Sequence, residues 1–270
     1  MYLRLCEFES LIGRLRYIAA LAWPGTAFLR EMTHYLTMLK REYVREYQLY
    51  PVVVKIPRWL LKDFHWWRYF LSKVQCVPIS QLLYEPTRFI SMSTDGATNG
   101  PAHDPRRWCP GIGIYFEGDW IMDSIPKALL KRFFDPYKNV EKDVHIAHFE
   151  MLAVLVGIKS FAERLNVFRD NGDSTPCLML YCDNTNVVDA LTRKRSDDAM
   201  MMACVRWICQ WMVRNQYRYF VKYVKTKDNV LADALSRYSV EDFKSECERI
   251  RLKYRATSTQ ARYQMDIMKF

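Results

Sequence analysis

Four acidic residues stand at positions of this chain where carboxylates are unusual. Asp95 ends an alternating apolar segment, Glu150 directly precedes an uncharged stretch, Asp183 ends an apolar run, and Asp233 falls in the first turn of a predicted helix. Carboxylates are seldom fully buried unless they are paired or bind a metal ion. Oxygen ligands without a nearby Cys or His favour Mg²⁺ or Mn²⁺. Together, the four positions predict a shared metal site.

The elements predicted around these acids would bring them to one place. In α/β folds, strand ends and the adjoining helix starts meet at one edge of the sheet. From about residue 88 to 240 we therefore expect a mixed α/β layer with an antiparallel hairpin that turns at Glu117-Gly118-Asp119. The strand-like segments are 88–95, 111–125 (two strands), 176–182 and 217–224, and the helix-like segments are 145–165, 184–194, 197–215 and 229–238.

The N-terminal third of the chain has helical periodicity instead. Residues 5–41 read as a helical hairpin broken at Trp23-Pro24-Gly25, and 58–74 as a third helix. A Pro-containing linker follows, which places a boundary near residue 86. We expect a helical segment over 1–85, an α/β domain over 86–240, and a helical C-terminal tail over 241–270.

Composition narrows the class of protein. The net charge of +10 over 270 residues favours a polyanionic partner such as nucleic acid, although a solvated basic surface gives the same balance. The eight cysteines include no C-x-x-C pair and read as buried free thiols of an intracellular protein, nuclear or cytoplasmic. We find no signal peptide and no run of 18 apolar residues, so no membrane partner is expected.

Each acid taken alone has an ordinary structural explanation. Asp95 could be a turn residue, Glu150 a complement to the helix dipole, and Asp183 the N-cap of the next helix. His145 and His148 do not form the H-E-x-x-H zinc motif and read as first-turn polar residues. The joint order Asp, Glu, Asp, Asp on strand, helix, strand end and helix start is what favours the metal site.

Four motifs carry these acids: STDGA, HFEMLAVLVGI, LYCDNTNVVDAL and DNVLADALSR. Together they resemble the four acidic motifs of ribonuclease H domains in retroelement reverse transcriptases, most of all the tyrosine-recombinase class of retrotransposons. The helical front, FESLIGRLRYIAALAWPGTAFLREM and LLKDFHWWRYFL, resembles the thumb or connection segment of those enzymes. The resemblance covers roughly residues 5–240.

The resemblance implies a ribonuclease H-like mixed five-stranded sheet flanked by helices, and endonucleolytic hydrolysis of the RNA strand of RNA–DNA hybrids. It makes Asp95, Glu150, Asp183 and Asp233 the catalytic residues and the ligands of two Mg²⁺ ions, with Mn²⁺ as a substitute. The chain has no Y-x-D-D-like polymerase motif and no His between the last strand and Asp233. A palm-containing chain is therefore a second expected partner, beside the hybrid.

Candidate hybrid contacts come from polar residues near these motifs. Asn184 follows Asp183, and Arg193, Lys194 and Arg195 form the densest basic run of the α/β part. Arg106 and Arg107 lie in the long 98–110 loop. The alternatives are a non-catalytic nucleic-acid-binding or scaffold remnant of a retroelement polymerase, and a related nuclease that acts on DNA.

Overall fold

The computed structural model describes residues 2–21, 24–43, 52–73, 89–98, 110–125, 145–170 and 177–252. The chain divides into two compact units. One comprises Met1–Thr87 with Ala190–Gln216, and the other Arg88–Asp189 with Tyr217–Phe270. The boundary predicted near residue 86 and the 98–110 loop with Arg106 and Arg107 lie outside the described residues, apart from Thr98 and Pro110 at the ends of that loop.

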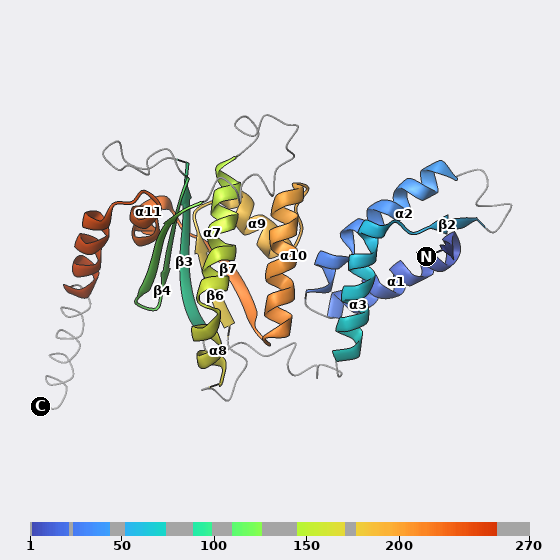
Figure 1. Cartoon of the computed structure of the whole chain (residues 1–270), viewed down its shortest axis with the longest axis horizontal. Helices are drawn as coiled ribbons and strands as arrows, with labels where there is room; N and C mark the ends of the chain where they lie inside the picture. Colours follow the sequence, from blue (N-terminus) through green and yellow to red (C-terminus); the bar gives the residue numbers. More distant parts are fainter. Residues whose placement is uncertain are drawn as a thin grey trace, which may run out of the picture. The chain divides into compact units, whose positions relative to one another are not determined.

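A mixed five-stranded sheet forms the centre of the second unit and confirms the predicted fold class. Its strand order is β5-β4-β3-β6-β7 (Figure 1). The neighbours β5, β4 and β3 run antiparallel, whereas β6 and β7 run parallel to β3. The strands are β3 (Phe89–Ala97), β4 (Gly111–Phe116), β5 (Asp119–Ser124), β6 (Cys177–Cys182) and β7 (Arg218–Tyr223).

The predicted hairpin is present and has a two-residue loop. β4 ends at Phe116 and β5 begins at Asp119, its direct cross-strand partner. Glu117 and Gly118 between them both have positive φ, 46° and 93°. Two positive φ values suit the twist of a tight antiparallel hairpin, and the second falls on the residue that adopts them most easily.

Helices cover both faces of the sheet. α7 (Ile146–Ser160) packs on β3 and β4 on one face, where Gly157 meets the side chains of Met92 and Ile114. α11 (Val230–Ser236) packs on the same two strands, but meets them at Gly113. Since Gly113 neighbours Ile114 in β4, the two residues point to opposite faces. α7 and α11 therefore lie on opposite sides of the sheet.

The predicted long helix over 145–165 is interrupted. α7 ends at Ser160, and a second helix, α8, covers Ala162–Asp170. Phe161 between them is buried, and its ring lies 4.8 Å from the ring of Phe116. The centre of α7 is buried nearly all round, as its uncharged stretch predicts.

Glycine at position 113 is required by the approach of α11. A Cβ atom there would lie 2.0 Å from the Ala232 carbonyl oxygen and 2.4 Å from the Ser236 nitrogen. We expect Gly113→Ala to lower the free energy of unfolding by about 3 kcal/mol or more, because backbone atoms cannot give way as side chains do. Urea denaturation measures this loss. Gly13→Ala is the matched control: its Cβ meets nothing within 4 Å, so helix propensity should stabilise that variant by about 0.5–1 kcal/mol.

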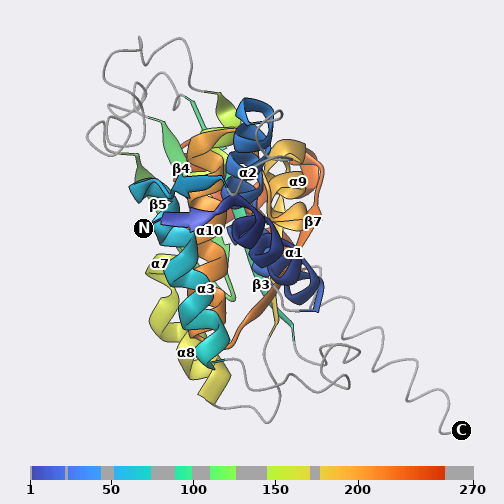
Figure 2. The same ribbon diagram turned by 90° about the vertical axis from the view of Figure 1, so that its right-hand side faces the viewer.

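The first unit contains the predicted helical hairpin and third helix (Figure 2). Phe8, Ile12 and Met32 are fully buried in its core, and the Trp67 indole donates to the Phe28 carbonyl at 3.1 Å. A short antiparallel pairing of β1 with β2 was not predicted. The elements are β1 (Tyr2–Arg4), α1 (Leu5–Leu21), η1 (Gly25–Phe28), α2 (Arg30–Glu42), β2 (Val53–Lys55), η2 (Arg58–Leu60), α3 (Leu61–Lys73) and α10 (Ala199–Arg214).

Two further helices complete the described chain. α9 (Thr185–Arg193) follows β6 directly. A helix over 240–252 follows α11, and its Phe243 ring lies 5.3 Å from Trp120 of the hairpin. Residues 253–270 of the predicted tail lie outside the described part. Among the described helices, none combines the length and apolar character needed to cross a bilayer.

Candidate metal centre

Asp95 is held on the face of the sheet that α11 covers. Its cross-strand partner is Gly113, the residue that lets α11 approach. Asp95 is only 4% exposed, and the Ser236 hydroxyl of α11 donates to its Oδ2. The strand, the glycine and the serine together fix one carboxylate in the interior, where charge is costly.

Glu150 reaches the same place from α7, on the other face. A Cβ at Gly96 would lie 2.5 Å from the Phe149 carbonyl carbon and 2.6 Å from the Glu150 nitrogen, so only glycine lets the first turn of α7 lie this close to β3. Glu150 is 3% exposed. Burial, followed by the charges of Asp95 and Asp183, raises the pKa of Glu150 to about 10.

Asp183 follows the last residue of β6 and is half-buried. Its Oδ1 is a buried atom that finds no hydrogen-bond partner among the residues the structure describes. The N-cap role left open for Asp183 belongs to Asn184 instead, because Asn184 Oδ1 accepts from the nitrogens of Asn186 at 3.0 Å and Val187 at 3.4 Å. Asp183 thus presents an unused ligand atom at the strand end.

Asp233 completes the group from α11. Its carboxylate accepts from the Arg237 side chain, Nε to Oδ1, at 2.8 Å. Burial, followed by the charges of Asp183 and Asp233, raises the pKa of Asp95 to about 7, while Ser236 and Arg237 oppose that rise. The structure therefore brings the four predicted acids into one electrostatic cluster.

Cys182 also lies in this cluster, contrary to the expectation of no cysteine nearby. Its Sγ is 3.8 Å from Glu150 Oε2, and ligand atoms of Glu150, Cys182 and Asp183 all lie within 4.8 Å of one another. Burial, followed by the charge of Glu150, raises the pKa of the Cys182 thiol far above its usual range. Thiol sulfur is a soft donor, whereas the carboxylate oxygens around it are hard donors, so the set as a whole favours a hard cation.

These residues fit a hard divalent cation. Burial, together with the repulsion between neighbouring carboxylates, raises the pKa values of Asp95 and Glu150, and a bound cation would relieve both effects. The unpartnered Oδ1 of Asp183 is a free oxygen donor in the same cluster. Oxygen donors of this kind suit Mg²⁺ or Mn²⁺.

Three residues in and around α11 support the cluster but were not among the predicted site residues. The sequence offers Asp228 or Asn229 as the N-cap of this helix; Asn229 holds that position without a side-chain capping bond, and its Nδ2 donates instead to the Thr94 carbonyl at 3.0 Å. Ser236 and Arg237 bind Asp95 and Asp233. Their spacing relative to Asp233 was a signal that the sequence offered, since residues three or four positions apart lie on the same face of a helix.

The remaining candidates have different surroundings. His145 and His148 form a capping box at the start of α7, as first-turn residues do. Arg193 and Arg195 are exposed, whereas Lys194 is half-buried and its Nζ donates to the Thr192 carbonyl at 3.2 Å. Burial lowers the pKa of Lys194.

We expect Ser236→Ala to lower the free energy of unfolding by about 1–3 kcal/mol, because the buried Asp95 oxygen loses its donor. Thermal unfolding without divalent metal measures the change. Ser72→Ala removes an exposed hydroxyl bond to the Tyr69 carbonyl and should be nearly neutral. Equal shifts in the two variants would contradict the role assigned to Ser236.

Comparison with solved structures finds ribonuclease H domains. RNase H1 from the halophilic archaeon Halobacterium salinarum NRC-1 is 14% identical, with 57% of this chain and 98% of that chain covered and a TM-score of 0.36. LC11-RNase H1 from compost is 16% identical, with 57% of this chain and 97% of that chain covered and a TM-score of 0.37. The N-terminal RNase H domain of rv2228c from Mycobacterium tuberculosis is 12% identical, with 54% of this chain and 95% of that chain covered and a TM-score of 0.34.

At these identities and TM-scores the matches assign no activity to this chain. No protein-family model and no curated protein sequence matches the chain.

Proposed function

We propose that this chain hydrolyses the RNA strand of RNA–DNA hybrids, with two Mg²⁺ ions held by Asp95, Glu150, Asp183 and Asp233. The observation that carries the proposal is the convergence of four carboxylates from β3, α7, the end of β6 and α11. Asp183 offers an unpartnered oxygen there, and two of the acids have strongly raised pKa values. Such a cluster is costly unless it binds cations, and cations at a carboxylate cluster are the means of phosphodiester hydrolysis.

The chain's own residues would orient the reacting groups. When bound, the metal ions would supply an activated water and neutralise charge on the leaving oxygen. Asp95 would be the central ligand of the ions, since it interacts with Glu150, Asp183 and Asp233. Ser236 and Asn229 would hold β3 and α11 in register around it.

We assign the chain to the ribonuclease H portion of a retroelement reverse transcriptase. The support is the sequence of the four motifs, above all DNVLADALSR. In this motif Asn229, Ser236 and Arg237 donate hydrogen bonds to Thr94, Asp95 and Asp233. A palm-containing chain is the partner that this assignment implies. The net charge of +10 is consistent with a nucleic-acid substrate.

The test supplies the same base sequence in four labelled forms: RNA–DNA hybrid, duplex RNA, duplex DNA and single-stranded RNA. Each form is incubated with Mg²⁺, Mn²⁺ or EDTA. We expect cleavage of RNA in the hybrid alone, with 3′-hydroxyl and 5′-phosphate ends, and none in EDTA. Cleavage of duplex DNA would show a different nuclease. Hybrid binding without cleavage in either metal would favour the non-catalytic alternative.

A further inference from the structure

A pocket in the first unit is lined by five arginines. It has a volume of about 830 Å³ and is formed by α1, α2 and the turn after α9. We call it the arginine groove and define it by Arg16, Arg30, Arg41, Arg193 and Arg195. Among its described lining residues the one acid is Asp197. Three threonines add hydroxyl groups, including Thr33, which accepts from the Arg16 guanidinium at 3.5 Å.

The positive charge of the groove is only partly compensated. Arg30 pairs with Glu31 at 2.7 Å and with Asp197 at 3.0 Å, and Arg195 shares the same Asp197 at 3.8 Å. Within the described part of the chain, no acid forms an ion pair with Arg16 or Arg41, and both side chains are exposed. The groove therefore combines a concave surface with a surplus of guanidinium groups.

The turn that presents Arg193 and Arg195 is fixed at both ends. Lys194 adopts a φ of 55°, and the Arg195 nitrogen donates back to the Ala190 carbonyl at 3.0 Å, which closes α9. The Asp198 side chain accepts from the Met201 nitrogen at 2.8 Å and caps α10. A turn pinned in this way loses little further freedom when a ligand binds.

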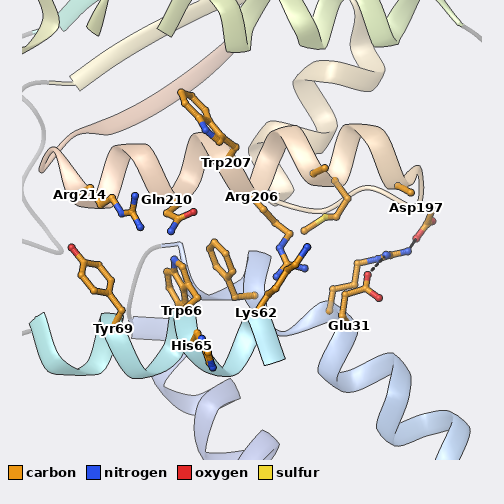
Figure 3. Close-up of a pocket in the computed structure, with 15 residues that line it drawn as sticks. Glu31, Lys62, His65, Trp66, Tyr69, Asp197, Arg206, Trp207, Gln210 and Arg214 are labelled. Carbon is orange, nitrogen blue, oxygen red and sulfur yellow. Dashed lines mark hydrogen bonds and ion pairs between the residues drawn. The ribbon is translucent and has the colours of Figure 1, made fainter. Parts of the chain in front are cut away.

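A second pocket of the first unit has two of its arginines already engaged with other side chains. It has a volume of about 850 Å³ and is lined mainly by α3 and α10 (Figure 3). Arg206 forms an ion pair with the buried Asp63 and lies 5.2 Å over the Phe28 ring. Arg214 lies 5.7 Å over the ring of Tyr69, and Figure 3 shows the two side chains facing each other. The arginine groove is the better anion site.

We propose that the arginine groove binds the sugar-phosphate backbone of a nucleic acid strand. A guanidinium group presents paired donors that match phosphate oxygens, and threonine hydroxyls make the same kind of contact. Contacts of this type add affinity and salt dependence without reading sequence. That the polyanion is nucleic acid rests on the proposed function, which this inference deepens by giving the helical segment a share in substrate binding.

The chain itself connects the groove to the acidic cluster. α9 begins two residues after Asp183 and ends at Arg193, so one nine-residue helix joins the candidate metal ligand to the arginine turn. The groove residues lie outside the carboxylate cluster, and they are expected to affect hybrid affinity and leave the chemical step unchanged.

The test compares Arg16→Ala/Arg41→Ala with the full wild-type chain. Binding of a fluorescent RNA–DNA hybrid is measured by anisotropy in EDTA, which prevents cleavage, over a series of salt concentrations. We expect roughly tenfold weaker binding near physiological salt, and a slope of log K against log salt reduced in magnitude by about two, one for each lost phosphate contact. The turnover rate at saturating hybrid should stay within about twofold of wild type.

Arg14→Ala/Arg68→Ala is the matched control, because it removes the same charge from exposed arginines that do not line the groove. Equal weakening in both double variants would mean that only net charge matters and would overturn the proposal. So would wild-type affinity in the groove variant, provided its circular dichroism is unchanged. The proposal would also be overturned if the groove variant lost affinity for poly-glutamate but kept its affinity for the hybrid. That result would favour an acidic protein partner. Since binding is read without metal, absence of cleavage defeats the proposed function and leaves the groove result standing.

Discussion

We expect Asp183→Asn to abolish cleavage of the hybrid, with a loss of at least about a thousandfold, while hybrid affinity stays within about twofold. Within the described part of the chain the buried Oδ1 of Asp183 has no hydrogen-bond partner, which supports its proposed role as a metal ligand. An amide in its place has one weaker oxygen donor and no charge, and metal-based stabilisation of the transition state amounts to several kcal/mol. Initial rates in Mg²⁺, with anisotropy in EDTA, measure the two effects separately.

The same substitution has a second readout that does not depend on catalysis. The charge of Asp183 raises the pKa of both Asp95 and Glu150. Its removal should therefore raise the unfolding temperature of the metal-free protein at neutral pH and weaken the stabilisation by Mg²⁺. Asp189→Asn is the matched control, on the exposed side of α9, and should leave cleavage and metal response unchanged. Full cleavage by Asp183→Asn would refute the metal-ligand role.

The stability of the metal-free protein should fall steeply as pH rises from about 5 to 9. Folding raises the pKa of Asp95 from 3.8 to about 7 and that of Glu150 from 4.5 to about 10, mainly through burial. The folded state then holds protons that the unfolded state has released, so stability decreases with pH between the unfolded and folded pKa values. Each such proton changes stability by about 1.4 kcal/mol per pH unit. Above pH 7 the slope should come from Glu150 alone.

Mg²⁺ should remove most of this pH dependence, since binding to the ionised cluster stabilises the folded state. We expect the unfolding temperature of the metal-free protein to drop by about 10 °C or more between pH 5 and 9, and Mg²⁺ to restore it at pH 9. Differential scanning calorimetry at the two pH values measures both. Glu150→Gln should flatten the dependence of the metal-free unfolding temperature on pH. Glu163→Gln, at an exposed position of α8, should leave that dependence unchanged. An unfolding temperature of the wild-type protein that does not change with pH would show that Asp95 and Glu150 are less buried than in the structure.

The sequence alone was sufficient to predict the class of sheet and, between residues 88 and 240, the order of the elements apart from the break between α7 and α8. It also singled out the four acids as a group. Period-2 alternation marks Phe89–Ala97 as a strand, and an uncharged stretch marks the buried centre of α7. These signals are local, because the side-chain periodicity of a strand or helix is set by the backbone of a few consecutive residues. Charged residues that interrupt such patterns are therefore visible without a structure.

The tertiary structure decided which groups share a space. Gly96 in β3 lies against α7, and Gly113 in β4 lies against α11. The sheet order β5-β4-β3-β6-β7 makes these two strands neighbours. That order also places Cys182 beside Glu150, and it gives Ser236 and Asn229 their partners in β3. Such contacts join residues 32 to 141 positions apart, and no local pattern encodes them.

The arginines illustrate the same division. Arg193 and Arg195 are visible in the sequence as a basic run of the kind that is usually a solvated loop. Only the fold adds Arg16 and Arg41 from helices more than 150 positions earlier in the chain, and turns the run into one wall of a groove. Sequence determined which charges the chain carries. Packing decided which of them act together, because electrostatic coupling depends on distance in space and on burial, and neither follows from position along the chain.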